Sequence, residues 1–394
     1  MAPSLRRRSL AAPAAVIAAA TLATACTGGT KEGEVKIGFI TALTGPVAFA
    51  GQTFANGIEL AVDQANRENH LSGGRTIKLE KKEGAEKPSQ AVDQARQLAV
   101  DQSVVGALCC ILSPVAGAVK VITSDAELPL NIYGATDLGL QDPPYVVRTT
   151  TLPQEANKRL ARKVAAEAKP ESVAFAVTQD NSGWVSQHES FKEGFAGTGV
   201  RDLGTVNTLA AQTDFSGAAG ELMAKNPEAV VISTLQQSAI SLIRALRSRG
   251  YQGLLVTTEV IGSPGAFKAA GATLADVPFP VYFFAGSAGP TGQEFARSYK
   301  AEYGTDPDAY AAQGYMAAYM MATAVKNAAT TTGADVTRES VTEALSDIKR
   351  LDDTIYGNVE FRDGQLYAPD SIVHVTWTKD GRQRTWAPAG AGTA

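Results

Sequence analysis

The residues best suited to chemistry lie in loops that follow predicted strands. One apolar strand ends in the segment Cys109 to Ser113, and Ser113-Pro114 has the pattern of a helix start. The free N–H groups and partial positive charge of a helix start suit a carboxylate. Two further strands end at Gly134-Ala135-Thr136 and near Glu259. Because ligands bind at such strand ends in open α/β sheets, these loops are candidate binding groups.

Three other side chains are candidates to line a site beside these loops. Phe49 and Trp184 supply aromatic surface, and Gln236 supplies an amide. Trp184 fits the core equally well, because His188 and Phe191 follow it at helical spacing. Phe49 fits an exposed loop aromatic equally well.

The loop residues also have structural explanations. Ser113 caps helices in many proteins without binding anything, and Thr136 can satisfy a turn. Cys110 fits a small buried residue, and Glu259 fits a solvated surface carboxylate. Residue types alone therefore leave both kinds of role open.

An alternation of strands and helices must position these residues. Val35 to Ile40 has the pattern of a strand, Thr44 to Gly51 of a Gly/Pro loop, and the next helix places Phe54, Ile58 and Val62 on one face. The same order recurs along the chain. Regular alternation predicts parallel sheets with helices on both faces, in an α/β fold of two doubly wound lobes joined by a hinge. Ligands favour the cleft between such lobes.

The chain is expected to cross between the lobes more than once. The turn signals Asp363-Gly364 and Asp380-Gly381 lie between β-rich runs and predict hairpins or edge strands. The first lobe is assigned residues 35–151 and 286–362, and the second is assigned residues 152–285 and 363–394.

The first 26 residues have the layout of a secretory signal peptide. Arg6, Arg7 and Arg8 precede an apolar run from Leu10 to Leu22, and Ala23-Thr24-Ala25-Cys26 follows. A cysteine after small residues resembles a lipobox, so we predict lipidation of Cys26 and a tether over residues 27–34. A plain signal peptide with an incidental cysteine is the alternative, and the export route, general or twin-arginine, stays open.

Length and composition indicate a globular protein of two lobes, which we expect to be a monomer. The chain has 394 residues, a hydrophobic fraction of 44% and a net charge of −4. That hydrophobic fraction suffices for large cores, and the weak charge gives no reason to expect nucleic acid as a partner. The mature part carries the adjacent pair Cys109-Cys110, for which we predict two buried thiols, with a vicinal disulfide as the less favoured alternative.

The stretch Val35 to Asn66 carries a family resemblance. Its KIG opening, its TGPVA run and its helix NGIELAVDQAN resemble the first β-α unit of branched-chain amino acid (Leu/Ile/Val) binding proteins of ABC transporters. The likeness follows the order of elements through most of the mature chain and is sharpest at residues 35–66, 104–149 and 244–259. It implies the type I periplasmic binding protein fold.

The resemblance also implies roles for the candidates. Gly134, Ala135 and Thr136 match a loop that contacts the bound amino acid, and Glu259 matches an acidic residue that pairs with its ammonium group. The family places a ligand-contacting serine near Cys110, so Ser113 or backbone amides would replace that hydroxyl here. The family's tyrosines near Phe49, Trp184 and Gln236 are absent as well, so side-chain selectivity is expected to differ.

An enzyme is the main alternative class. The histidines His70, His188 and His374 have no carboxylate or cysteine at a spacing typical of a metal site or a triad. The sequence also lacks the motifs GxSxG, GxxxxGK[ST] and HExxH. We therefore predict no catalytic residue, no metal and no cofactor.

The sequence therefore predicts a lipid-anchored, extracytoplasmic protein that captures an amino acid, most plausibly of the branched-chain type. It would deliver this guest to the permease of an ABC importer. A sensor that passes ligand state to a membrane receptor is the second alternative, since the same two-lobed architecture serves both. The identity of the solute stays open.

Overall fold

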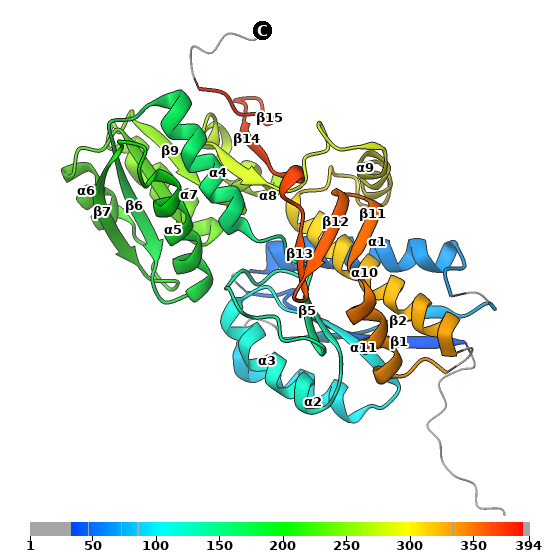
Figure 1. Cartoon of the computed structure of the whole chain (residues 1–394). Helices are drawn as coiled ribbons and strands as arrows, with labels where there is room; N and C mark the ends of the chain where they lie inside the picture. The colour runs from blue at the N-terminus through cyan, green and yellow to red at the C-terminus, as the bar shows by residue number, and fades with distance from the viewer. Residues whose placement is uncertain (1–32, 46, 72, 85–86, 333–334, 389–394) are drawn as a thin grey trace, which may run out of the picture.

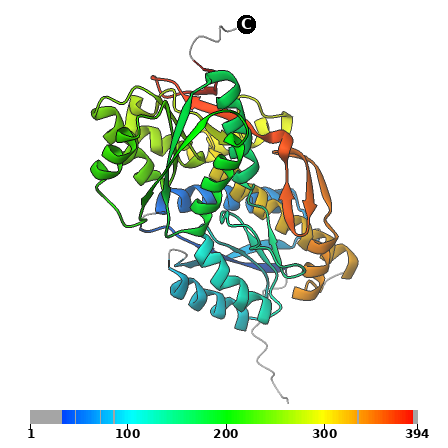
Figure 2. The same ribbon diagram turned by 60° about the vertical axis from the view of Figure 1, so that its left-hand side comes forward.

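A computed structural model of the chain describes residues 33–45, 47–71, 73–84, 87–332 and 335–388. The predicted signal peptide, Cys26 and most of the tether lie outside these residues, so their assignment stays a prediction. Figures 1 and 2 show two lobes, one containing the blue and cyan N-terminal elements and the other the green central elements. Among the described residues, each helix is too short or too polar to cross a membrane.

The first lobe is built on an eight-stranded sheet. The five N-terminal strands of this sheet pair in parallel. Its other three strands pair antiparallel with one another, and one of them joins the parallel part through a single parallel pair. Across the sheet the strands are β11 (Arg350–Thr354), β12 (Gly357–Arg362), β13 (Gln365–Tyr367), β5 (Val146–Arg148), β4 (Leu130–Ile132), β3 (Val104–Cys109), β1 (Glu34–Thr41) and β2 (Thr76–Glu83).

Helices cover both faces of this sheet because its central strands are apolar on both sides. In β3, Val105 and Leu108 belong to one hydrophobic cluster, whereas Val104 and Ala107 belong to the other. One face carries α2 (Pro88–Val100) and α3 (Ser113–Asp125), and the other carries α1 (Ala48–Arg67), α9 (Pro290–Tyr303), α10 (Ala309–Thr332) and α11 (Arg338–Asp347).

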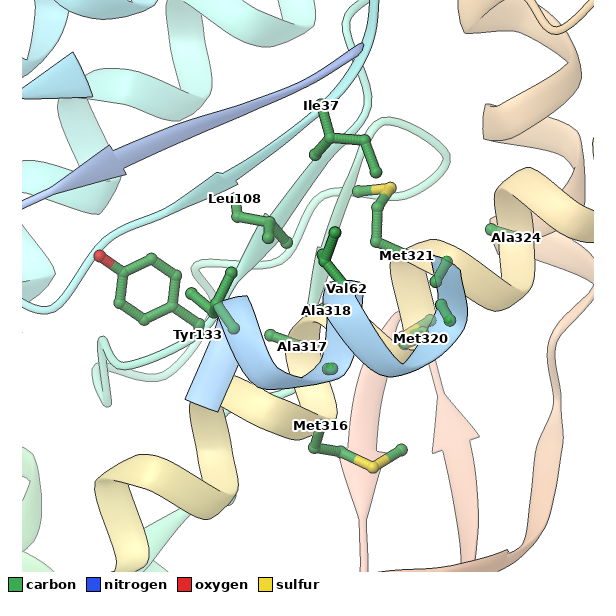
Figure 3. Packing of buried hydrophobic residues seen from close by; sticks show 14 of the residues in the cluster. Ile37, Val62, Leu108, Tyr133, Met316, Ala317, Ala318, Met320, Met321 and Ala324 are labelled. Atoms are coloured by element: carbon green, nitrogen blue, oxygen red, sulfur yellow. The ribbon is translucent and has the colours of Figure 1, made fainter. Parts of the chain in front are cut away.

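The helices α1 and α10 pack closely over the sheet. Figure 3 shows Val62 of α1 and Met321 of α10 beside Ile37 and Leu108 of the strands. A Cβ on Gly57 of α1 would lie 2.0 Å from a main-chain oxygen of α10. A residue without a side chain therefore allows this close approach.

The second lobe repeats the architecture on a smaller scale, with helices on both faces of a parallel sheet. This sheet comprises β7 (Arg201–Thr208), β6 (Ser172–Thr178), β8 (Ala229–Ser233) and β9 (Leu254–Thr257). One face carries α4 (Pro153–Lys163) and α5 (Ser182–Phe195), and the other carries α6 (Ser216–Ala224), α7 (Gln236–Ser248) and α8 (Pro264–Ala270). A small antiparallel sheet comprises β10 (Phe279–Val281), β14 (Val373–Trp377) and β15 (Gln383–Thr385). The expectation of two doubly wound lobes is confirmed.

The segments that connect the lobes contact one another. The Tyr282 hydroxyl donates to the Leu152 carbonyl at 2.6 Å, and Gln365 Nε2 donates to the Thr150 carbonyl at 2.9 Å. The placement of Gln365 also corrects the assigned boundary. Because β13 pairs with β5, the first lobe continues through Tyr367, and the chain crosses after it and not at residue 362.

Candidate ligand-binding site

A cavity of about 390 Å³ lies between the two lobes. Most of its lining comes from the loops and helix starts that follow strands in both sheets. Two of the predicted site residues, Cys110 and Ala135, are fully buried and do not line the cavity. The predicted residues that do line it are Phe49, Ser113, Gly134, Thr136, Trp184, Gln236 and Glu259.

Ser113 has a different local role from the one expected. Its side chain does not cap α3, whose N-cap residue is Leu112. Instead, Ser113 Oγ accepts hydrogen bonds from the backbone N–H groups of Thr136 at 3.3 Å and Asp137 at 3.1 Å. Ser113 therefore joins the loop after β3 to the loop after β4, and both loops reach the cavity.

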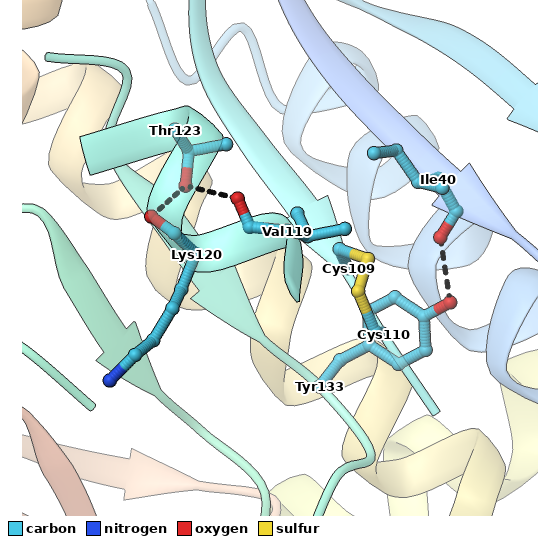
Figure 4. Close-up of a disulfide and its surroundings, with 7 residues drawn as sticks. All are labelled: Ile40, Cys109, Cys110, Val119, Lys120, Thr123 and Tyr133. Atoms are coloured by element: carbon cyan, nitrogen blue, oxygen red, sulfur yellow. Dashed lines mark hydrogen bonds between the residues drawn. A yellow bond between two sulfur atoms is a disulfide. The ribbon is translucent and has the colours of Figure 1, made fainter. Parts of the chain in front are cut away.

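The adjacent cysteines are buried as predicted, but they are joined in the less favoured vicinal disulfide and are not two thiols. Figure 4 shows the Cys109–Cys110 disulfide beside Tyr133. The Cys110 carbonyl accepts a hydrogen bond from the Ala135 N–H at 3.0 Å. Cys110 and Ala135 thus shape the backbone behind the cavity wall, and their side chains lie away from the guest's space.

Helix starts bring partial positive charge to the cavity. The N-cap residues Val47 of α1, Leu112 of α3 and Leu235 of α7 all line it, and none of these helices has a side-chain cap. The start of α5 is capped instead by Asn181, whose side chain accepts from the Gly183 N–H at 3.0 Å. Uncapped helix starts offer N–H donors and favour a negative charge. These parts of the cavity lining therefore suit a carboxylate.

Glu259 supplies the opposite charge. It starts a short helical turn, η2 (Glu259–Ile261), directly after β9, and only 8% of it is exposed. Of the described residues that line the cavity, none is a lysine or an arginine. The Glu259 carboxyl accepts a hydrogen bond from Gln313 Nε2 of α10, at the long distance of 3.5 Å. Glu259 is thus a buried carboxylate and not the solvated one that residue type alone allowed.

The environment of Glu259 disfavours its charged form. Burial raises the pKa of the Glu259 carboxyl to about 7. The nearby Asp308 carboxylate also raises this pKa, whereas the hydrogen bond from Gln313 lowers it. A cation placed next to this group would restore its charged form, because opposite charges stabilise one another strongly where water is excluded.

Aromatic side chains form much of the remaining surface. Phe49 and Phe54 of α1 contact Tyr310 of α10, with ring centroids 6.3 Å and 5.1 Å apart. Trp184 lines the cavity from the second lobe and also packs against that lobe's core. Sequence reasoning missed Tyr310, which follows no strand and is brought to the cavity by the return of the chain to the first lobe.

Sequence reasoning also missed Gln187, although a signal was present. Gln187 follows Trp184 by three positions on α5 and therefore shares its helix face. Its Nε2 donates to Thr136 Oγ1 of the first lobe at 3.3 Å. The α4 residue Gln154 makes a second bond of this kind, from Nε2 to the Thr136 carbonyl at 2.7 Å.

These bonds join the two lobes across the cleft. Gly183, at the start of α5, lies so near the first lobe that a Cβ on it would be 2.7 Å from Ser113 Oγ and 2.9 Å from Thr136 Oγ1. Absence of a side chain at position 183 therefore permits the contact.

The fold and the cavity together define a class. The sequence profile described as "Periplasmic binding protein" matches residues 34–382, so the chain belongs to the periplasmic binding protein family. This is a family of solute-binding proteins and not of enzymes, in agreement with the sequence-based expectation. The resemblance to Leu/Ile/Val-binding proteins is confirmed as well.

Individual relatives are distant. A protein of Brucella melitensis named Leu/Ile/Val-binding protein homolog 7 is 24% identical over 301 residues, which cover 70% of this chain and 72% of that protein. A branched-chain amino acid transporter substrate binding protein from Streptococcus pneumoniae, solved in complex with isoleucine, has a TM-score of 0.79 at 20% identity and covers 90% of this chain and 100% of its own. A solute binding protein from R. palustris, solved in complex with 4-hydroxybenzoate, has a TM-score of 0.78 at 19% identity and covers 90% and 96%. The two solved structures share the fold of this chain.

Proposed function

We propose that this chain is an exported, lipid-anchored solute-binding protein that captures an amino acid between its lobes and delivers it to an ABC importer. The observation that carries the proposal is Glu259, a buried carboxylate without a lysine or arginine among the described residues of the cavity lining. An ammonium group on the guest supplies the missing partner through charge-assisted hydrogen bonds.

The other end of the guest meets the helix starts. The uncapped N-termini of α1 and α3 in the first lobe and of α7 in the second offer backbone donors to a carboxylate. A zwitterion satisfies both kinds of group at once, whereas a simple amine or a simple acid satisfies one.

The relatives' names support an amino acid and make the branched-chain type the first guest to test. The R. palustris structure holds an aromatic acid in the same fold, and the present cavity also has aromatic walls. An aromatic acid, however, leaves Glu259 unpaired. The charge pattern of the cavity therefore favours the amino acid.

The test is a thermal-shift screen of the mature protein over amino acids, amides and small acids, followed by titration calorimetry. The best amino acid is compared with its deaminated acid and its decarboxylated amine, which each remove one charged end. We expect each analogue to bind at least about tenfold more weakly, the loss of one charged hydrogen bond. Binding of aromatic acids alone, or equal binding of the deaminated acid, would refute the proposal.

A further inference from the structure

Two buried carboxamides of the second lobe face the cavity. Gln187 of α5 is 2% exposed and Gln236 of α7 is 3% exposed, and both line the cavity. Each side chain has its amide nitrogen in use: Gln187 Nε2 donates to Thr136 Oγ1, and Gln236 Nε2 donates to Ser263 Oγ, both at 3.3 Å. The Oε1 atom of each is buried and has no hydrogen-bond partner.

Among the described residues, the buried carboxamide oxygens without a partner include these two, which belong to side chains that line the cavity. Most buried polar side-chain atoms have a partner, and an exception calls for an explanation. Rotating either amide would exchange the oxygen for an N–H group but would still leave one polar atom of that carboxamide unpaired. Two separate helices therefore present unsatisfied hydrogen-bonding groups to the same space.

The charges of the cavity lining limit which side chain of the guest can pair with Gln187 and Gln236. The lining described here contains no basic residue, and its one carboxylate is Glu259, which the proposed function assigns to the ammonium of the guest. A charged side chain on the guest would have no charge partner left and would be costly to bury. A neutral side chain with N–H or O–H groups meets no such cost.

We propose that Gln187 and Gln236 recognise a neutral, hydrogen-bonding side chain on the guest, such as a carboxamide or a ureido group. This inference rests on the proposed capture of an amino acid. Within that class, the site would disfavour amino acids with purely aliphatic side chains. The cavity of about 390 Å³ has room for such a guest, because a water molecule occupies about 30 Å³ of liquid and glutamine has only about ten non-hydrogen atoms.

Two pairs of ligands with similar shapes test the proposal on the wild-type protein. Asparagine is compared with leucine, and glutamine with methionine, by titration calorimetry at one pH. A site that pairs buried polar groups rejects an analogue that lacks them, so the amides are expected to bind at least about tenfold more tightly. Leucine or methionine binding as tightly as its amide counterpart would overturn this inference while leaving amino acid capture intact. Failure of every amino acid to bind would overturn both.

Variants separate recognition from lobe closure. Gln236→Leu is the sharper one, because the recorded partner of Gln236, Ser263, lies in the same lobe. We expect it to weaken amide binding roughly tenfold to hundredfold and to shift the ratio of amide to aliphatic affinity toward the aliphatic ligand. An unchanged ratio would overturn the role of Gln236.

Gln187→Leu also removes the bond to Thr136 across the cleft, so the affinity ratio is again the deciding readout. A shifted ratio supports recognition, whereas an equal loss for both ligands assigns Gln187 to closure and overturns its part in the proposal. The matched control is Gln252→Leu, at an exposed position outside the cavity lining, which should leave both affinities unchanged.

Discussion

Replacing Glu259 by glutamine tests the central charge of the cavity with little change of shape. The side chain is almost fully buried, and its recorded donor is the Gln313 amide at 3.5 Å. A glutamine keeps the packing but cannot pair with an ammonium group as an ion. Removing one member of a buried ion pair costs about 3–5 kcal/mol. We therefore expect Glu259→Gln to weaken amino acid binding by roughly 200- to 5,000-fold.

The same variant should stabilise the protein without its guest. An increase of the Glu259 pKa from 4.5 to about 7 corresponds to roughly 3 kcal/mol between the two protonation states. Because the pKa in the folded state is the higher one, this contribution to stability is fully present below pH 4.5 and is lost as the pH rises through about 7. Above that pH, the free Glu259→Gln protein should unfold at a higher temperature than the free wild type.

The affinity of the wild type for the amino acid should rise with pH, whereas the stability of the free protein should fall. The ammonium group pairs with the ionised carboxyl, so wild-type affinity should fall roughly tenfold for each pH unit below about 7. The Glu259→Gln variant should show no such dependence. Calorimetric titrations at several values between about pH 5 and pH 9, paired with thermal unfolding of the free proteins, give both profiles.

Two results would refute this reasoning. The first is equal affinity of wild type and Glu259→Gln for the amino acid at neutral pH, which would remove the carboxyl from recognition. The second is a free variant that is less stable than wild type above pH 7, which would mean that the ionised carboxylate has a partner in the folded protein. Glu360→Gln, a surface change, is the control that should alter neither measurement.

Three further substitutions and one control variant test closure and packing. Gly183→Ala puts a methyl group 2.7 Å from Ser113 Oγ, so ligand affinity should fall roughly tenfold or more and ligand-induced compaction in small-angle scattering should shrink; unchanged compaction would contradict the contact. Gly57→Ala forces α1 away from α10 and should lower the free energy of unfolding by about 2 kcal/mol in urea titrations, whereas Gly117→Ala, with open space around it, should raise it by up to about 1 kcal/mol. Arg338→Met removes a buried guanidinium that donates to five main-chain carbonyls and should cost about 3 kcal/mol or more by the same measurement; a loss below about 1 kcal/mol would show that these bonds contribute little.

The fold and the general position of the cavity follow from local pattern. Strands that are apolar on both faces, such as β3, must lie inside a sheet covered by helices, and parallel strands place their carboxyl ends at one edge. Ser113, Thr136 and Glu259 each follow such an end, which is why their position in the lining could be predicted. The boundary at residue 362 was wrong because a hairpin signal shows a turn without showing which sheet receives its second strand.

The remaining features depend on tertiary contact. Tyr310 belongs to a helix that starts far from any strand end, and only the return of the chain brings it beside Phe54. Ser113 has the sequence pattern of a helix cap, yet its oxygen is taken by the neighbouring loop. The Cys109–Cys110 disulfide was not favoured because adjacent cysteines have too little freedom for an ordinary bridge. For Tyr310 and Ser113, a contact with a segment distant in sequence overrode the local rule.

The burial of Glu259 links recognition to closure. The side chain comes from the second lobe, but Gln313 and Tyr310 of the first lobe contribute to its surroundings, so its burial depends on both lobes. Without a guest, closure places a carboxylate in an environment with no cation in the described lining, which opposes closure. An ammonium group removes that cost in the closed state and contributes less in the open state, where water already solvates the carboxylate. Under the proposed function, the guest therefore binds the closed state preferentially, and this difference in affinity would allow an ABC importer to distinguish the loaded protein from the empty one.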